Sequence, residues 1–465
     1  MPHLVSPAPL SLPLAELLSS FTYALDMTDG QPEGHSIRCC WIGTHIGQQL
    51  GMEGTELWEL YYTLLLKDLG CSSNAARISQ LYKTDDHSFK HDFKFLDSNI
   101  GEALKFLNSH AATNMDLGQR LKTMAHVMKN KTSLSKELIT TRCTRGADIA
   151  RQMHFSDAVT NGIHSLDEHW DGGGLPEGLK GDEIPVYSQI ALLSQVIDVF
   201  FLSKGKHAAL DEIRNRADRW FNPKLVGAFE AVAQNESFWT SLQSYDLPHR
   251  IFELEPAQQK VMVDDQWMDD IALAFGQVVD AKSPFTASHS QRVGDISHAL
   301  GKRLGISTHR LPWLRRAALL HDVGKLGVSN TILDKPGPLA DDEWERMRDH
   351  AYKSEQILSR ITVFGDLARA ASAHHERLDG TGYPRGLKGD EISLETRIIT
   401  IADFYDALTA DRPYRAALPV DQALSIMYDE LHTTIDPDCY VALTNILPEL
   451  PAFAENQDLS CLISA

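Results

Sequence analysis

The sequence predicts an all-α protein made of two tandem helical bundles. Apolar residues recur at helical spacing in long amphipathic runs such as 392–410, ISLETRIITIADFYDALTA. We find no sustained alternation of apolar and polar residues between hairpin turns. The heptapeptide GLKGDEI occurs at 178–184 and again at 386–392. A repeat of this length indicates a duplicated unit, so two bundles are expected.

Longer alignments set the register between the two copies. EHWDGGGLPEGLKGDEI at 168–184 aligns with ERLDGTGYPRGLKGDEI at 376–392, an offset of 376 − 168 = 208 residues. Nearer each start, GHSIR at 34–38 aligns with SHSQR at 288–292, and LLLKDLG aligns with ALLHDVG, at an offset of 288 − 34 = 254. The difference, 254 − 208 = 46 residues, predicts an insertion in the first copy within about 83–141.

The length of the chain also favours two units, because 465 residues are too many for one ordinary core. We expect a first unit over 1–215, a helical linker over 216–258 that ends in a polar, Pro-containing stretch, and a second unit over 259–465. A long helix at 260–281 is expected to open the second unit. The two copies are expected to contact each other, and the chain could also pair as a homodimer.

Composition indicates a soluble cytoplasmic protein. The net charge of −19 argues against binding to polymeric nucleic acid or to an anionic membrane. The longest apolar run, 190–202, is interrupted by polar residues and is shorter than the roughly 18 residues of a membrane span. The N-terminal MPHLVSPAPLSLPLAELL lacks a basic region and is interpreted as a Pro-rich leader. No CxxC spacing occurs, which predicts reduced thiols at Cys39, Cys40, Cys71, Cys143, Cys439 and Cys461.

The second copy is rich in side chains that bind transition metals. Imidazoles and carboxylates on separate predicted helices suggest a metal site in the core of a bundle. The candidates are His289, His321, Asp322, His350, His374, His375 and Asp403. This mixture suits Fe, Mn, Ni, Co or Zn. An Asp beside a His can bridge two ions, and a pair of ions about 3.5–4 Å apart can activate water for attack on phosphorus.

Some of these residues have a simpler explanation. His289 and His350 could be solvated helix residues, whereas Asp403 lies in an apolar helical face where an unpaired carboxylate would be costly. The adjacent histidines open the stretch 374–384, HHERLDGTGYP, in which two glycines permit a tight turn. A solvated helix end followed by a glycine turn is the alternative there. Taken jointly, the candidates favour the metal site.

These motifs resemble the HD-GYP phosphodiesterases, a branch of the HD metal-dependent phosphohydrolases. The resemblance covers about 260–450 and includes HDVGK at 321–325, HHERLDGTGYP at 374–384 and ADFYDALTADRPYR at 402–415. It implies HD-type helical-bundle domains and a phosphodiesterase that opens cyclic di-GMP or 3′3′-cyclic GMP-AMP to a linear dinucleotide.

The resemblance also implies roles for individual residues. The seven candidates above would be metal ligands, with Asp322 bridging two ions and acting with Lys325 in catalysis. Lys325, Tyr383, Arg412 and Arg415 would bind the substrate, and the three cations would supply the local positive charge that an acidic chain needs. Family members with a third metal place Glu one helical turn before the first histidine. Phe285 stands there, so we expect two ions and attack by a hydroxide that bridges them.

The first copy is expected to be catalytically dead. At the two offsets, the ligand positions are occupied by His35, Lys67, Asp68, Arg142, Leu166, Asp167 and Gln195, and Lys325 and Tyr383 correspond to Cys71 and Leu175. Only His35 and Asp68 keep ligand chemistry at the matching positions, which is too few for a binuclear centre. The nearby His164 and His169 are interpreted as structural or exposed. We hypothesise that this copy regulates or dimerises the protein, or binds a nucleotide without hydrolysing it.

Two other functions are compatible with parts of the sequence. An HD phosphohydrolase of mononucleotides would share the metal ligands, but the GTGYP and DRPYR segments argue against it. A cyclic-dinucleotide receptor or interaction protein with little catalysis would not need to keep all the ligands, and the second copy keeps them.

Overall fold

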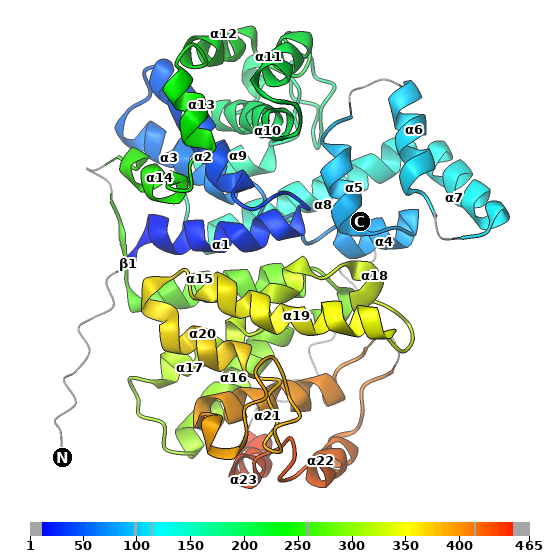
Figure 1. The fold of residues 1–465 in the computed structure, drawn as a ribbon, viewed down its shortest axis with the longest axis vertical. Helices are drawn as coiled ribbons and strands as arrows, with labels where there is room; N and C mark the ends of the chain where they lie inside the picture. Colours follow the sequence, from blue (N-terminus) through cyan, green and yellow to red (C-terminus); the bar gives the residue numbers. More distant parts are fainter. Residues whose placement is uncertain (1–11, 97–99, 113–114, 257–259, 413–414, 450–465) are drawn as a thin grey trace.

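The computed structural model describes residues 12–96, 100–112, 115–256, 260–412 and 415–449. The described chain is almost entirely helical, which confirms the all-α prediction. Its two strands, β1 (Leu12–Pro13) and β2 (Met262–Val263), are two residues each and pair antiparallel. Figure 1 shows the helices of the first copy above and those of the second copy below, with β1 and β2 joining the start of one to the start of the other.

The first copy begins with three helices that have counterparts in the second. The helices up to the predicted linker are α1 (Leu14–Thr28), α2 (His35–Gln49), α3 (Gly54–Leu66), α4 (Ala75–Tyr82), α5 (Asp86–Phe93), α6 (Ile100–His110), α7 (Leu117–Lys129), α8 (Lys131–Gln152), α9 (Asp157–His164), α10 (Val186–Lys204) and α11 (Lys206–Asn215). The predicted insertion forms α5, α6, α7 and the start of α8, beside the main bundle in Figure 1. It shares a separate apolar cluster with α4, which contains Ile78, Tyr82, Phe89, Phe106, Leu107, Val127 and Leu138.

The second copy repeats this pattern without the insertion. Its helices are α15 (Asp265–Asp280), α16 (His289–Arg303), α17 (Leu311–Leu320), α18 (Asn330–Leu333), α19 (Asp341–Leu358), α20 (Gly365–Ser372), α21 (Leu394–Thr409), α22 (Val420–Asp429) and α23 (Pro437–Ile446). α16 packs on both α17 and α21, as α2 packs on α3 and α10. The start of each histidine-bearing helix is anchored in the same way. Asp280 accepts hydrogen bonds from Ser290 N and Oγ, as Asp26 does from Ser36.

Residues 216–256, the described part of the segment expected to link the copies, pack against the first bundle. They form α12 (Pro223–Val232), α13 (Glu236–Leu242) and α14 (Leu247–Leu254), and α12 and α14 lie against α2. The apolar side chains of Phe229, Trp239 and Ile251 are buried there. The sequence pattern missed this packing because short amphipathic helices separated by polar turns resemble a linker. We propose that the first unit extends through α14.

The two copies share one continuous apolar core. α1 packs on α19 and on the 3₁₀ turn Val323–Gly327, and Phe21 stacks on Phe275 with ring centroids 4.0 Å apart. Burial of large apolar side chains is the main stabilising contribution to such an interface, about 25 cal/mol per Å². The second copy is therefore built against the first copy and is not tethered loosely to it.

Among the described residues, α10 is the one helix long and apolar enough to span a membrane. However, 78% of its most apolar window is buried inside the protein, as in a core helix of a soluble protein. The five described cysteines are buried and form no disulfide. Residues 1–11, which begin the predicted leader, and Cys461 lie outside the described residues.

Candidate metal centre

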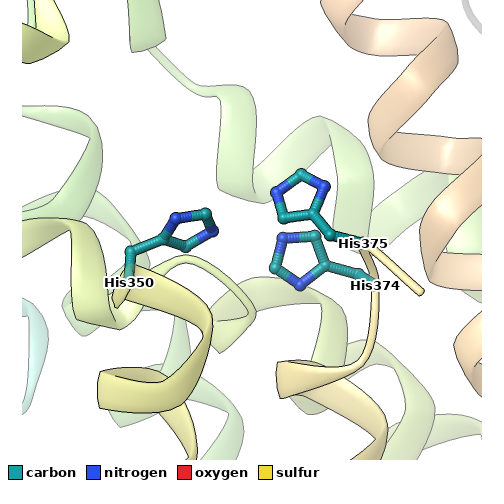
Figure 2. A group of neighbouring side chains, drawn as sticks. All are labelled: His350, His374 and His375. Atoms are coloured by element: carbon teal, nitrogen blue, oxygen red, sulfur yellow. The ribbon is translucent and has the colours of Figure 1, made fainter. Parts of the chain in front are cut away.

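The structure brings all seven predicted ligands of the second copy to one place, in the interior of the lower bundle. His289 opens α16, His321 and Asp322 follow α17, and Asp403 lies on α21. The other three come from α19 and from the segment after α20, and Figure 2 shows the rings of His350, His374 and His375 facing one another. Potential ligand atoms of these residues lie within 4.8 Å of one another in three overlapping groups.

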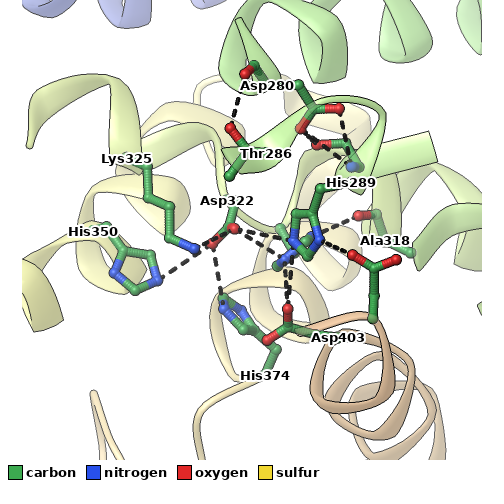
Figure 3. A network of polar contacts seen from close by, with 12 residues as sticks. Asp280, Thr286, His289, Ala318, Asp322, Lys325, His350, His374 and Asp403 are labelled. Carbon is green, nitrogen blue, oxygen red and sulfur yellow. Dashed lines mark hydrogen bonds and ion pairs between the residues drawn. The ribbon is translucent and has the colours of Figure 1, made fainter. Parts of the chain in front are cut away.

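The carboxylate of Asp322 lies at the centre of the cluster and faces two sets of histidines (Figure 3). Its Oδ1 is 3.5 Å from His350 Nε2 and 3.6 Å from His374 Nε2. Its Oδ2 is 3.6 Å from His289 Nε2 and 3.2 Å from His321 Nε2. Each oxygen is thus directed to a different half of the cluster, which is the arrangement a bridging ligand requires.

In four of the imidazoles, the Nδ1 atom faces away from the cluster and lies within hydrogen-bonding distance of an oxygen atom. The Nδ1 atoms of His321, His350 and His374 each lie 2.6–2.7 Å from a backbone carbonyl oxygen of the preceding helical turn. His289 Nδ1 lies 2.6 Å from Asp406 Oδ2. When Nδ1 donates in this way, Nε2 carries the lone pair, and the second partner orients the ring for metal binding. The four Nε2 atoms all point into the cluster, and each is an acceptor when its ring is neutral. Burial would lower the pKa of His289, but hydrogen bonds with Asp322 and Asp406 raise it to about 9, so metal binding displaces a proton from this ring.

These inward atoms have no hydrogen-bond partner. The Nε2 atoms of His289, His321, His350 and His374, together with Asp322 Oδ1, are buried and unsatisfied. Buried polar groups are nearly always paired, and leaving several unpaired at one point is costly. A set of imidazole lone pairs and carboxylate oxygens converging on the same space is the donor set of a divalent transition metal. The residues present fit a metal centre.

Burial sets the protonation states that a metal centre needs. Burial lowers the pKa of His350 to about 4 and that of His374 to about 3, so both are neutral at physiological pH. Burial would raise the pKa of Asp322, but His321 and Lys325 hold it well below its usual range. Neutral imidazoles and an ionised carboxylate are the forms that bind metals.

Two glycines allow the segments that carry these ligands to approach each other. A Cβ at Gly324, two residues after Asp322, would collide with the carbonyl oxygen of His350, so only glycine lets α19 come this close. A Cβ at Gly382 would collide with the backbone at Glu376 and Arg377. The buried carboxylate of Glu376 binds the other side of this loop through the backbone N–H groups of Arg385 and Leu387. The loop 374–384 is therefore held rigidly at the centre.

Two predicted substrate-binding residues lie at the edge of the cluster. Lys325 is half-buried and its ammonium contacts Asp322 Oδ2. Tyr383 is half-buried and stacks on His375 with ring centroids 4.8 Å apart. Both lie beside the cluster, and their role in substrate binding stays a prediction.

The two predicted phosphate-binding arginines lie in the segment after α21. Arg412 and Arg415 form a small backbone bridge around residues 413 and 414, which lie outside the described residues. The guanidinium of Arg415 donates to the carbonyl oxygens of Ala407, Leu408 and Ala416 at 2.7–2.9 Å. It therefore terminates α21, and its role in substrate binding stays a prediction.

Sequence reasoning missed Asp406. Its carboxylate holds His289 and also accepts from Arg292 Nη2 at 3.0 Å. Asp406 lies one helical turn after Asp403, and the repeat contains the signal that could have revealed it. At the offset of 208 it corresponds to Asp198, which holds His35 and Arg38 at 2.7 and 2.6 Å.

The first copy has the same frame but not the same centre. Lys67, at the position of His321, places its ammonium 3.1 Å from His35 Nε2 and in contact with Asp68. Both ring nitrogens of His35 are thereby occupied, because its Nδ1 lies 2.7 Å from Asp198 Oδ2. Arg142, at the position of His350, forms an ion pair with Asp167. His164 and His169 are half-buried, and neither is among the ligand groups that could hold a metal.

Comparisons with known proteins agree with this geometry. A family model described as an HD domain matches residues 116–225 and 274–439, one segment in each copy. The chain is 53% identical to the 3′3′-cGAMP-specific phosphodiesterase 3 of Vibrio cholerae over 96% of this chain and 97% of that protein. It is 36% identical to the 3′3′-cGAMP-specific phosphodiesterase 1 of the same organism, over 47% and 51% of the two chains.

A solved structure is similar over nearly the whole chain. The crystal structure of a cyclic GMP-AMP specific phosphodiesterase of V. cholerae matches with a TM-score of 0.65 and 48% identity, covering 95% of this chain and 99% of the other. The family model, the relative and the helical fold agree with the HD pair at 321–322 and the GYP triplet at 382–384. The chain therefore belongs to the HD domain family, in its HD-GYP branch.

Proposed function

We propose that the second copy hydrolyses a cyclic dinucleotide to a linear one, with 3′3′-cyclic GMP-AMP as the preferred substrate. The observation that carries this proposal is the convergence of four unsatisfied imidazole nitrogens and the two oxygens of Asp322 on one buried point. The choice of substrate is supported by the name of the relative that is 53% identical over almost the whole chain. Relatives named for cyclic di-GMP are 31–36% identical over shorter segments, which makes cyclic di-GMP the second candidate.

Two metal ions fit the cluster. One would be held by His289 and His321 with Asp403, whose Oδ1 lies 3.4 and 3.9 Å from their Nε2 atoms. The other would be held by His350, His374 and His375, with one oxygen of Asp322 facing each set. Bound divalent ions supply Lewis acidity, which activates water and offsets charge on phosphoryl oxygens. Phe285, in the 3₁₀ turn before α16, offers no oxygen or nitrogen for a third ion.

The side chains at the edge of the cluster bind and orient the substrate. The Lys325 ammonium can donate to a phosphoryl oxygen, because its side chain is 18% exposed and it already contacts Asp322, the carboxylate that would face both ions. Tyr383 offers an aromatic face and a hydroxyl next to His375, suited to a base or a ribose. Arg412 is a second candidate for the phosphate that is not cleaved. Local cations of this kind are needed because the chain as a whole repels an anion.

The test is product analysis with purified full-length protein loaded in turn with Fe²⁺, Mn²⁺, Ni²⁺ or Co²⁺. We expect one phosphodiester bond of 3′3′-cyclic GMP-AMP to be cleaved faster than that of cyclic di-GMP, and the product to be a linear dinucleotide. Asp322→Ala serves as the inactive control. Turnover of neither substrate under any loading, or full activity of Asp322→Ala, would reject the proposal.

A further inference from the structure

The first copy contains a cavity of about 290 Å³ at the position of the catalytic centre. Its floor includes Arg142, Asp167, Leu175 and Gln195. These are the counterparts of His350, His375, Tyr383 and Asp403 at the offset of 208. The volume lies just below the range of about 300–1,000 Å³ typical of small-molecule sites. The duplication has therefore kept the place where substrate binds in the second copy while changing its chemistry.

Built-in cations take the place of the metal ions. The Lys67 ammonium lies 3.1 Å from His35 Nε2 and 3.4 Å from Gln195 Oε1, and it contacts Asp68. Lys94, which the insertion supplies, lies 3.1 Å from the same Gln195 oxygen and forms an ion pair with Asp29. The ammonium groups of Lys67 and Lys94 thus both contact Gln195. Gln195 occupies the position of Asp403, which belongs to the ligand cluster of the second copy.

The lining of the cavity is positively charged in a chain of net charge −19. Four cationic side chains and two carboxylates line it, a formal excess of two positive charges: Lys90, Lys94, Lys131 and Arg142 against Asp29 and Asp167. Lys94 and Arg142 pair with these two carboxylates, and the Lys90 ammonium also lies 3.7 Å from Asp86 behind the cavity wall. This excess matches one phosphate dianion or two phosphodiesters. A guanidinium with five donors in a fixed fork is well suited to phosphate oxygens, and lysine binds phosphate as a point charge.

The walls above this charged floor are apolar and aromatic. The insertion covers the cavity with Phe89 and Phe93 of α5, next to Tyr82 at the end of α4, so a helix that the second copy lacks forms most of its roof. At the other side, the rings of His169 and Trp220 stack with centroids 4.0 Å apart. Aromatic rings opposite a cationic floor match a planar base joined to a phosphate, because a base stacks on such rings and the phosphate pairs with the cations.

We propose that this cavity is a metal-independent binding site for a nucleotide, which it holds without hydrolysis. The neighbouring Lys67 and Lys94 keep the charge that attracts phosphate, but neither activates water as a metal ion would. His35, the one histidine kept at a matching ligand position, has both ring nitrogens occupied. Binding therefore needs no divalent ion and leaves the ligand intact.

One helix connects this cavity to the catalytic copy. Lys90 of α5 and Lys94, the residue after this helix, line the cavity, and Asp86 at the start of the helix contacts the second copy. Asp86 Oδ2 is 3.1 Å from Lys282 Nζ, and Asp86 Oδ1 accepts a hydrogen bond from Asn330 N at 2.9 Å. All three residues of this contact are buried. Asn330 follows Lys325 by five residues, so a ligand that moves α5 acts on the segment behind the catalytic lysine.

Two variants probe the cavity without touching the catalytic centre. Ile139→Trp fills it from a half-buried position on α8, and Lys131→Glu reverses a charge at its exposed rim, where little folding stability is at stake. Asp322→Asn removes the catalytic centre and leaves the cavity intact. The probes are 5′-GMP, 5′-AMP and 3′3′-cyclic GMP-AMP, with oleate as an anionic apolar control, all titrated calorimetrically into full-length protein in EDTA.

We expect at least one nucleotide to bind one-to-one in EDTA, with equal affinity for the wild type and Asp322→Asn. Lys131→Glu should weaken this binding roughly tenfold, and Ile139→Trp should abolish it. Binding of no nucleotide, binding unchanged in both cavity variants, binding lost in Asp322→Asn, or binding of oleate alone would overturn the proposal. Because this titration is independent of turnover, its result stands whether or not the second copy hydrolyses the expected substrate.

A second measurement tests the connection through α5. The nucleotide that binds in EDTA should change the turnover rate of the metal-loaded wild type at least twofold and leave that of Ile139→Trp unchanged. A rate that responds equally in both proteins would place the effect at the catalytic centre and contradict the connection.

Discussion

The two copies of this protein share a polar frame and differ in what that frame holds. In each, an aspartate binds the histidine that opens the second helix of the copy, and it also binds an arginine of that helix. This aspartate is Asp198 on α10 in the first copy and Asp406 on α21 in the second. In each, a buried glutamate holds the following loop through backbone N–H groups, as Glu168 and Glu376 do. The predicted ligands differ, since Lys67 stands at the position of His321 and Arg142 at the position of His350. Contacts that position a loop are thus separable from the groups that perform chemistry on it.

The largest expected difference between the copies is at the position of His374. His374→Ala should reduce turnover about a thousandfold or more, because the metal ligands act together and the loss of one removes most of the activity. Its counterpart Leu166→Ala should cost about 2–5 kcal/mol of stability through a cavity in the core, with turnover per folded molecule unchanged. Initial rates and urea denaturation of both variants measure this. Equal losses of turnover in the two would show that the first copy takes part in catalysis.

The next difference concerns the aspartates of the frame. Asp406→Asn should weaken metal binding or activity roughly 10–100-fold, the usual effect of removing the partner of a ligating histidine. Asp198→Asn disturbs the same contact in the first copy and should leave metal affinity unchanged. Metal titration with a competing chelator separates the two. If the variants have the same metal affinity, His289 is not a ligand oriented by Asp406.

The contact between the copies should be sensitive to acid. Burial would raise the pKa of Asp86, but Lys282 and Lys90 hold it well below the usual value of about 3.9. A carboxyl with a lowered folded-state pKa contributes stability above its unfolded pKa and loses it as the pH falls. Asp86→Ala should therefore cost roughly 3–5 kcal/mol at pH 7, and less as the pH falls below about 4. Thermal denaturation of the wild type and of Asp86→Ala at pH 7 and at a pH below about 4 measures this difference in stability. A destabilisation by Asp86→Ala that is larger in acid than at pH 7 would contradict the prediction.

The smallest effects are expected at the two arginines after α21, a segment that the first copy lacks. The isolated backbone bridges Ala217–Phe221 and Leu431–Ile435 lie 214 residues apart, six more than the offset of 208, so about six residues around 411–416 have no counterpart. Arg415→Ala should cost about 1 kcal/mol of stability, because its guanidinium holds carbonyls at the end of α21. Arg412→Ala should instead raise KM. The reverse pattern would assign the phosphate contact to Arg415.

The site was more predictable from the sequence than its surroundings were. HD, HHE and the aspartate of ITIADFYDAL are local patterns whose chemistry has few other uses, and a carboxylate on an apolar helical face, as at Asp403, demands a partner. Asp406 was missed because a second carboxylate one turn away also fits an exposed helical face. The cavity of the first copy could not be predicted, since its roof comes from an insertion with no repeat to compare. The packing of α12–α14 was missed because tertiary contacts decide whether a short helix is a linker.

Metal content measured together with turnover tests the division between the copies most directly. Asp322→Ala and Asp68→Ala remove the corresponding carboxylate from each copy of the full-length protein. We expect the wild type and Asp68→Ala to bind two ions per chain and to open 3′3′-cyclic GMP-AMP at similar rates per folded molecule. We expect Asp322→Ala to lose both metal and turnover. An Asp68→Ala protein that loses bound metal while Asp322→Ala retains it would contradict the account.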